Sequence, residues 1–489
     1  MRSVRMIPSS PLAAWLLLLG CGYSLSSAAV FEALYQEGPP EAAEHTPELE
    51  IQPSPANAQD DSPVVMRAAL SHPAYTRSIP GTLALKIDLA GAVAEALGQR
   101  PVLNLALVID RSGSMADDDK FEYAMQAARL VVENLSQRDI VSVIAFNQDA
   151  VVLSPAGPAV NRAFLDHRLD EIAPVGWTNL SAGLLEAFAQ IDAQASDEQT
   201  KRVIVLTDGL ANRGVTDPGQ LRRLVVSARS RGIGVSTMGC GEEFDEKVLI
   251  ALAEAGGGRY TYIRSSEQIP KAMSGELNGL LHVVAQNVKV EVVAIDRLDI
   301  TGVHGRLLEQ PVRAFTFDLG DVREGEHGVL LLKLRPRDFV LGAVAAIDCT
   351  LSFDRTDLAV RQQHVVRLEA VMIDDKALVW QSADQGVVLY AEVMDAVEKA
   401  QDAVLGLDAD GFRDAAKLFQ RHFETARRYA HNARDQQLLN QTFMLKHFMA
   451  ELFAASESGL MHGHKEARRR LTKEVEYRRY LREHHRRFD

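Results

Sequence analysis

Cysteine is scarce in this chain, which has three cysteines in 489 residues. Cys240 and Cys349 each lie in an apolar, strand-like run, and we place the two runs in different domains. A disulfide framework needs several paired cysteines, so that class of protein is excluded. We expect two buried free thiols, because free cysteine behaves as a small apolar residue.

Long hydrophobic runs are also missing, since no uninterrupted apolar stretch beyond the N-terminal region has transmembrane length. The run Leu12–Leu19 is too short to span a bilayer comfortably, and Arg2 and Arg5 precede it. This order of charge and apolar residues is typical of an export signal, which we place at residues 1–28.

The sequence Leu18-Leu19-Gly20-Cys21 within this signal is similar to the bacterial lipobox. The similarity implies that Cys21 is lipidated and becomes the first residue of a membrane-anchored protein. Gly22 follows the cysteine, where a residue other than Asp resembles the outer-membrane-sorted class of a Gram-negative host. The alternative is ordinary secretion with cleavage after Ala28, which would discard Cys21.

Positive charge is in short supply, because the formal net charge is -13, and this argues against a general nucleic-acid binder. Residues 31–61 contain eight acids, five prolines and no Lys or Arg, so we expect a disordered acidic tether. Residues 463–489 are the exception and form a basic segment. We expect a solvated helical tail there, and contact with anionic lipid, envelope polymer or the protein's own acidic surface is the alternative.

Enzyme signatures are absent as well. The sequence has no HExxH, no GxSxG, no Gly-rich phosphate loop ending in Lys-Ser/Thr and no CxxC pair. We therefore expect no enzymatic activity. A hydrolase remains the minor alternative, because a distant histidine could approach a serine in the folded chain.

Apolar strands alternate with amphipathic helices over residues 101–276. The predicted strands are Leu103–Ile109, Ile140–Phe146, Val203–Thr207 and Val235–Gly239, and the predicted helices are Phe121–Leu135, Asn179–Ile191, Gln220–Arg231 and Glu246–Ala255. This alternation predicts an α/β domain with a doubly wound, mostly parallel sheet. Ligands of such sheets bind beyond the carboxyl ends of the strands.

Strand-like segments flank this domain on both sides, over residues 62–100 and 283–375. They are Val64–Leu70 and Thr82–Ala90 upstream, and Val283–Ile295, Arg313–Asp318, Val329–Leu334, Val344–Phe353 and Arg361–Ala370 downstream. Two strands alone are unstable, so we expect one antiparallel β-sandwich built from both flanks, with the α/β domain inserted in it. The alternative is a free N-terminal hairpin and a separate downstream domain.

Helical spacing replaces the strand pattern after Asp384, and over residues 384–456 we expect a small helical bundle or, alternatively, a helical arm against the sandwich. The predicted helices are Val387–Val404, Asp410–Tyr429 and Asp435–Ala455.

Polar side chains follow two predicted strands of the α/β domain. Asp110 comes directly after Leu103–Ile109, and Asp208 directly after Val203–Thr207, so both carboxylates lie at the same edge of the sheet. Thr178 lies in a loop before a helix and can present its hydroxyl there. With the hydroxyls of Ser112 and Ser114, this oxygen-only set suits Mg²⁺, Mn²⁺ or Ca²⁺ and is a poor match for zinc.

Asp110-Arg111-Ser112-Gly113-Ser114, with Thr178 and Asp208, resembles the metal-ion-dependent adhesion site (MIDAS) of von Willebrand factor type A (VWA) domains. The surrounding sequence is similar to bacterial and extracellular members related to inter-alpha-trypsin-inhibitor heavy chains and calcium-activated-chloride-channel-like proteins. The resemblance implies a divalent cation, Mg²⁺ first, held by these five side chains. In the family, a Glu or Asp of a partner protein completes the coordination.

Two features beside the site depart from the family pattern. Trp177 replaces a common glycine, and it is expected either to form an apolar wall beside the ion, contacting the ligand, or to pack under its loop. Asp117-Asp118-Asp119 has the spacing of the second metal site of integrin beta subunits. We expect instead an exposed acidic turn that caps the next helix.

These observations together predict an exported cell-envelope protein, anchored at the outer membrane or cell surface, that binds a protein partner through a metal-dependent adhesion site. The alternative is an envelope scaffold component that holds a fixed partner subunit, with a structural metal site.

Overall fold

The computed structural model describes residues 62–77, 83–92, 100–159, 162–196, 199–355, 360–406, 409–462 and 465–483. The predicted signal peptide, the lipidation site Cys21 and the predicted tether over residues 31–61 lie outside the described residues, as does residue 82 at the start of one predicted strand.

A six-stranded sheet forms the centre of the α/β domain, with the strand order β6-β5-β4-β7-β8-β9. Its strands are β4 (Val102–Asp110), β5 (Ile140–Phe146), β6 (Ala150–Pro158), β7 (Gln199–Thr207), β8 (Ile233–Cys240) and β9 (Tyr260–Ile263). All neighbours pair in parallel except β6, which runs antiparallel along the edge of β5.

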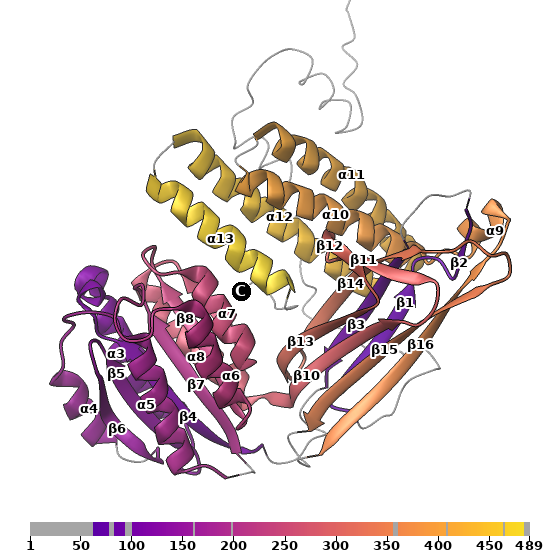
Figure 1. Cartoon of the computed structure of the whole chain (residues 1–489). Coiled ribbons are helices and arrows are strands. Elements are labelled where there is room, and N and C mark those ends of the chain that lie inside the picture. The colour runs from indigo at the N-terminus through magenta and orange to yellow at the C-terminus, as the bar shows by residue number, and fades with distance from the viewer. Residues whose placement is uncertain are drawn as a thin grey trace, which may run out of the picture. The chain divides into compact units, whose positions relative to one another are not determined.

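Helices cover both faces of this sheet (Figure 1). They are η2 (Gly113–Asp119), α3 (Lys120–Asn134), α4 (Arg162–Asp170), α5 (Leu180–Ala193), α6 (Pro218–Arg229), α7 (Glu246–Gly256), η3 (Ser266–Gln268) and α8 (Ile269–Leu281). One apolar cluster joins the sheet to α3 and α8, and another joins it to α5 and α6. The predicted doubly wound α/β fold is therefore confirmed.

The segments that precede and follow this domain in the sequence together form two five-stranded sheets, which pack as one sandwich. The first has the order β1-β3-β14-β11-β12 and the second β13-β10-β15-β16-β2. The strands are β1 (Val64–Leu70), β2 (Ala74–Tyr75), β3 (Leu83–Gly91), β10 (Val283–Ala294), β11 (Leu298–Val303), β12 (Arg306–Val312), β13 (Ala314–Arg323), β14 (His327–Pro336), β15 (Val344–Arg355) and β16 (Arg361–Met372).

Strands from both flanks pair within these sheets, since β3 pairs with β14 and β2 pairs with β16. Both flanks also share one apolar core, in which Leu85 and Ile87 pack with residues such as Ile347. The prediction of one sandwich with the α/β domain inserted is confirmed, and the alternative of a free N-terminal hairpin is wrong.

The C-terminal region is helical and comprises α9 (Lys376–Gln381), α10 (Gln385–Leu405), α11 (Ala409–Ala433), α12 (Gln436–His462) and α13 (Lys465–Glu483). Asp384 caps α10 by accepting a hydrogen bond from the backbone N–H of Val387. Val393 and Val397 of α10 are fully buried and belong to an apolar cluster that includes Leu331 of β14. The bundle therefore packs on the face of the first sheet that points away from the sandwich core.

The basic helix α13 is packed against the rest of the chain, contrary to the expectation of a solvated tail. The Tyr480 hydroxyl accepts a hydrogen bond from the backbone N–H of Tyr260 at 2.8 Å, and Arg264 pairs with Glu474. On another side of α13, Arg479 pairs with Glu398 of α10 at 2.6 Å. Amphipathic side chains thus fix α13 against both the α/β domain and the bundle, because their apolar stems pack while their polar ends are paired.

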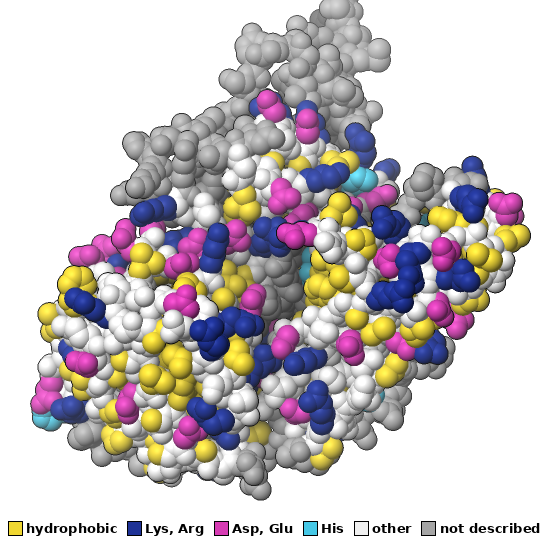
Figure 2. Space-filling view, viewed as in Figure 1, with side chains coloured by type: hydrophobic (Ala, Val, Ile, Leu, Met, Phe, Trp, Pro, Cys, Tyr) yellow, Lys and Arg dark blue, Asp and Glu magenta, His cyan; other side chains and the backbone are white. Residues whose placement is uncertain are grey.

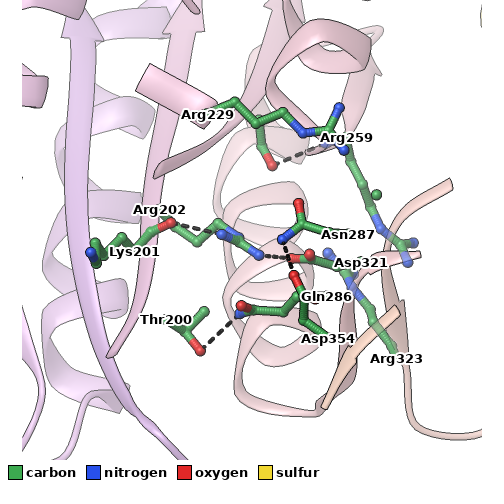
Figure 3. A network of polar contacts seen from close by, with 12 residues as sticks. Thr200, Lys201, Arg202, Arg229, Arg259, Gln286, Asn287, Asp321, Arg323 and Asp354 are labelled. Carbon is green, nitrogen blue, oxygen red and sulfur yellow. Dashed lines mark hydrogen bonds and ion pairs between the residues drawn. The ribbon is translucent and has the colours of Figure 1, made fainter. Parts of the chain in front are cut away.

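Polar contacts also join the α/β domain to strand β13 of the sandwich (Figure 3). Arg202 of β7 donates to Asp321, and Arg323 pairs with Glu276 of α8 at 2.7 Å. All four side chains are largely buried, with exposed fractions of 4% to 15%. Removal of one partner from a buried ion pair strongly destabilises a protein, because it leaves the other charge buried and unpaired. These contacts therefore fix the inserted domain on the sandwich.

Two further expectations concern cysteine and the membrane. Cys240 and Cys349 are buried and free, as predicted. Within the described part of the chain, no helix is long and apolar enough to cross a membrane. Figure 2 shows Lys and Arg side chains interspersed with Asp and Glu over the viewed face, so this face carries no broad basic surface.

Candidate metal centre

Two carboxylates emerge at one edge of the six-stranded sheet. Strand β4 ends at Asp110, and Asp208 follows the last residue of β7. These strands are parallel neighbours, with Ile109 opposite Leu206, so their carboxyl ends lie side by side. Both carboxylates are completely buried.

Asp110 is held by hydroxyl and amide groups. Its Oδ1 accepts a hydrogen bond from the backbone N–H of Ser112 at 2.8 Å, and its Oδ2 accepts one from Thr207 Oγ1 at 2.5 Å. Among the described residues, no basic side chain pairs with it. Burial therefore raises the pKa of Asp110 from 3.8 to about 6, although the hydrogen bonds from Thr207 and Ser112 oppose this rise.

The two serines connect Asp110 to Asp208. Ser112 Oγ and Ser114 Oγ lie 3.2 Å apart, and Ser114 Oγ donates to Asp208 Oδ1 at 2.7 Å. The turn that carries them follows β4 directly, which allows both hydroxyls to face the strand ends. Four of the five predicted site residues thus form one continuous chain of polar contacts.

Thr178 completes the group from the loop before α5. Its side chain is buried, and its backbone N–H donates to Asn212 Oδ1 at 2.9 Å. A Cβ atom added at Gly209 would lie 3.1 Å from Thr178 Oγ1 and 3.7 Å from Ser114 Oγ. The two hydroxyls therefore converge over Gly209, and a side chain at this position would crowd the Thr178 hydroxyl. No described residue hydrogen bonds to Thr178 Oγ1.

The structure adds two residues that the sequence analysis missed. Thr207, the last residue of β7, binds Asp110 as described above. Lys120, the first residue of α3, places its Nζ 2.8 Å from Asp208 Oδ2. Burial alone would lower the pKa of Lys120, but the hydrogen bond and charge of Asp208 outweigh it and the pKa is raised. Neither role had a sequence signal beyond the residue type at an element boundary.

The group of side chains fits a hard divalent cation. It supplies carboxylate and hydroxyl oxygens alone, without the His or Cys ligands that zinc prefers. Asp110 lies buried with no positively charged side chain of the described residues paired with it, and a bound cation would supply that charge. The cradle over Gly209, with one unbonded hydroxyl, is consistent with a ligand of this kind.

The acidic turn Asp117–Asp119 is exposed and does not join this group. Asp118 and Asp119 have positive φ angles of 53° and 54°, and Asp119 makes no side-chain hydrogen bond as the N-cap of α3. The turn is exposed as expected, but the expected capping is wrong. The candidate centre contains two carboxylates, and the described residues form no separate group of three or more His, Cys, Asp or Glu side chains that could hold a metal.

Trp177 lies beside the site and is 51% exposed, so it is not packed under its loop. The guanidinium carbon of Arg213 lies 4.6 Å from the centre of its indole ring. This distance is typical of a cation–π contact. The ring therefore stands at the surface next to Thr178, held by a neighbouring loop.

The sequence profile of the von Willebrand factor type A domain matches residues 104–274, which include all five site residues. The uncharacterized protein YfbK of Escherichia coli K12 is 27% identical over 256 residues, which cover 51% of this chain and 44% of that protein. Human inter-alpha-trypsin inhibitor heavy chain H3 is 26% identical over 275 residues, covering 49% of this chain and 30% of that protein. The chain thus spans less than half the length of both relatives.

Among solved structures, a von Willebrand factor type A protein from Catenulispora acidiphila superposes with a TM-score of 0.57 and 16% identity. The match covers 78% of this chain and 91% of that one. At this identity the likeness shows the fold alone. The profile match and the shared fold show that residues 104–274 of this chain have the fold of a von Willebrand factor type A domain.

Proposed function

We propose that this domain is a protein-binding module that depends on a divalent cation, Mg²⁺ first, with Mn²⁺ or Ca²⁺ as alternatives. One observation carries the proposal: Asp110 and Asp208 are fully buried carboxylates linked by serine hydroxyls, and among the described residues one ammonium group, that of Lys120, pairs with Asp208 and none pairs with Asp110.

Charge balance supports the cation. Lys120 compensates Asp208, whereas Asp110 accepts hydrogen bonds and is paired with no cation in the described part of the chain. An uncompensated buried carboxylate is costly, and the protein has no other described group within reach that offsets it. A cation held by Asp110, Ser112, Ser114, Thr178 and Asp208 would supply the missing charge.

The position of the site supports the proposal of protein binding. VWA domains commonly mediate protein–protein interactions. The five side chains lie beyond the carboxyl ends of β4 and β7, where α/β sheets bind ligands. A bound cation there offers a coordination position that a Glu or Asp of a partner protein can take, replacing water.

The cellular location is part of the proposal. We place the protein in the cell envelope, exported and anchored at the outer membrane or cell surface through lipidated Cys21. Support comes from the apolar run Leu12–Leu19, the lipobox-like sequence ending at Cys21 and the acidic residues 31–61 that follow it.

The metal site is tested by titrating the protein with Mn²⁺ and recording free Mn²⁺ by electron paramagnetic resonance. Thr178→Val keeps the shape of the side chain and removes a hydroxyl that has no protein partner, so the domain should remain folded. We expect its Mn²⁺ affinity to fall by about tenfold or more, because even indirect partners of metal ligands have effects of that size.

Asp117→Asn is the matched control, since Asp117 is exposed and lies outside the group of five. It should bind Mn²⁺ as tightly as the wild type does. Equal affinities of the wild type and the Thr178→Val and Asp110→Ala variants, all shown to be folded by their thermal transitions, would reject the site.

The anchor is tested by growing cells with an alkyne-labelled fatty acid and measuring label on the protein. Cys21→Ser should abolish labelling and release the protein from the membrane fraction. Cys240→Ser, a change at a buried thiol, should leave both unchanged. Continued labelling of Cys21→Ser would show that Cys21 carries no lipid.

A further inference from the structure

Three loops surround the candidate metal centre, and hydrogen bonds join them into one surface. We call residues 111–114, 175–179 and 209–213 the rim loops. The backbone N–H of Val175 donates to the Arg111 carbonyl at 2.8 Å, and that of Gly113 to the Gly176 carbonyl at 3.1 Å. The backbone N–H of Asn212 donates to the Thr178 carbonyl at 3.0 Å, which ties the third loop to the second.

The rim loops expose large apolar side chains next to the site residues. Val175, Trp177 and Leu210 are 56%, 51% and 54% exposed. Trp177 precedes Thr178, and Leu210 follows Gly209, over which the hydroxyls of Thr178 and Ser114 converge. Exposed apolar groups gathered beside a polar site are typical of a binding surface.

The rim loops also carry positive charge outside the site itself. Their charged side chains are Arg111 and Arg213, and neither pairs with a carboxylate among the described residues. Arg213 lies over the Trp177 ring, so it holds the ring in place and remains available to an anion. Arg111 donates to Asn147 Oδ1 at 3.2 Å.

We propose that Trp177 and Arg213 determine which partners the domain binds. The occupant of the rim loops is an exposed segment of a partner protein in which the Asp or Glu that reaches the cation lies within two residues of an aromatic or branched apolar side chain. That apolar side chain packs on Trp177 and Leu210. This inference rests on the proposed metal-dependent binding and adds which partner sequences the rim loops select.

The chemistry of the surface supports this occupant. Tryptophan and arginine are the residue types that dominate binding energy at protein interfaces, because they combine large apolar area with a polar group. Arg111 and Arg213, neither of which pairs with a carboxylate among the described residues, favour an acidic segment and disfavour a basic one. A carboxylate alone would leave the exposed indole and Leu210 in water, and an apolar neighbour in the segment buries them.

The test uses random linear peptides displayed on phage and panned on the full-length protein with Mn²⁺. Phage are eluted with EDTA, and the selected peptides are sequenced. The wild type should enrich peptides with an acid and an aromatic or branched apolar residue within two positions. Trp177→Ala should still enrich acids and lose the apolar preference.

A matched control is available, because Trp380 in α9 is 52% exposed and lies outside the rim loops. Trp380→Ala should select the same peptides as the wild type. For a synthetic peptide taken from the wild-type selection, we expect Trp177→Ala to weaken Mn²⁺-dependent binding about tenfold, as for a typical apolar anchor. Arg213→Gln should weaken it less and make it less sensitive to salt.

Fluorescence provides an independent readout. Trp15 lies in the proposed signal peptide, so in the processed protein replacement of Trp380 by Phe leaves Trp177 as the remaining one of the three tryptophans in the sequence. Addition of the peptide with Mn²⁺ should shift its emission to shorter wavelength, because the ring loses contact with water.

The outcomes separate the two levels of the proposal. Acid-only peptides from both the wild type and Trp177→Ala would overturn the role of Trp177 and leave metal-dependent binding intact. A selection without any EDTA-eluted peptides would overturn both. An unchanged emission of Trp177 on binding would place the apolar contact elsewhere and reject the inference.

Discussion

Burial of Asp110 links the proposed metal binding to pH at the scale of a single residue. Its carboxyl group is completely buried, and burial raises its pKa to about 6 despite two hydrogen bonds. The proton is favoured in the folded state without a cation, so protonation of Asp110 stabilises the metal-free protein fully below its ordinary pKa of 3.8, and that stabilisation is lost as the pH rises from 3.8 through about 6. A cation needs the ionised group, so proton and metal compete.

The competition predicts the pH dependence of Mn²⁺ affinity. Above pH 6 Asp110 is ionised, so its titration should not change the Mn²⁺ affinity. Below pH 6 the affinity should fall by up to about tenfold for each pH unit, because binding must release one proton. Mn²⁺ titrations on either side of this pKa measure the effect. Asp110→Asn cannot titrate, so it should bind weakly with a flatter pH profile. A wild type with a flat profile would contradict the competition.

The five oxygen-bearing site residues could be predicted from the sequence because each lies at an element boundary. Asp110 and Asp208 follow apolar strands, and Thr178 precedes a helix, so the doubly wound topology brings them to one edge. The contacts of Thr207 and Lys120 could not be predicted, because they depend on where a side chain points after the strands and α3 have packed.

At the scale of the element, strand β9 shows how an edge is protected. It has four residues, pairs with β8 on one side and meets α13 on the other. An open strand edge is a liability that proteins cover with other elements. Lys473 of α13 secures the cover, since its Nζ donates to the Phe244 carbonyl at 2.7 Å and to Glu246 at 2.8 Å.

Lys473→Met should therefore loosen β9. The substitution keeps most of the apolar stem and removes the charge that satisfies Glu246, so we expect a loss of about 1–3 kcal/mol in stability. Amide hydrogen exchange should rise at Tyr260, whose N–H depends on Tyr480 of α13. Arg469→Gln alters an exposed pair on the same helix and should change little. Equal exchange at Tyr260 in both variants would show that Lys473 does not hold α13.

Strand β15, which has a clear period, was predicted well, and strands β6 and β12, which have none, were missed. The β15 strand buries alternate residues, such as Cys349 and Leu351, and its prediction started at the observed residue. Most residues of the edge strand β6 are half-buried and Leu153 alone is fully buried, whereas β12 is exposed along most of its length. Neither strand therefore shows the alternation of a core strand. The docking of α13 depends on contacts that composition does not reveal.

At the scale of the whole described chain, charged side chains hold the VWA domain on the sandwich (Figure 3). Glu276 of α8 is central, because its carboxylate accepts hydrogen bonds from Ser236 of β8 and Arg323 of β13, both at 2.7 Å. Burial alone would raise the pKa of Glu276, but the charges of Arg323 and Arg259 outweigh it and hold the pKa at about 2. The group is therefore ionised when it joins the two parts.

The sign of this shift predicts how the junction responds to acid. A folded-state pKa of about 2, below the ordinary 4.5, means that Glu276 contributes stability above pH 4.5, and that this contribution is lost as the pH falls through 2. Glu276→Gln leaves Arg323 without its charge partner, so at neutral pH it should cost about 3 kcal/mol or more. Denaturant unfolding at neutral pH and at successive values below pH 4.5 measures the difference in the free energy of unfolding between the wild type and Glu276→Gln. This difference should become smaller towards low pH. Asp318→Asn is the matched control, because Asp318 forms a more exposed pair with Arg229 at the same junction and should cost about 1 kcal/mol or less. If both variants lost the same stability at every pH, the buried pair would not be what holds the two parts together.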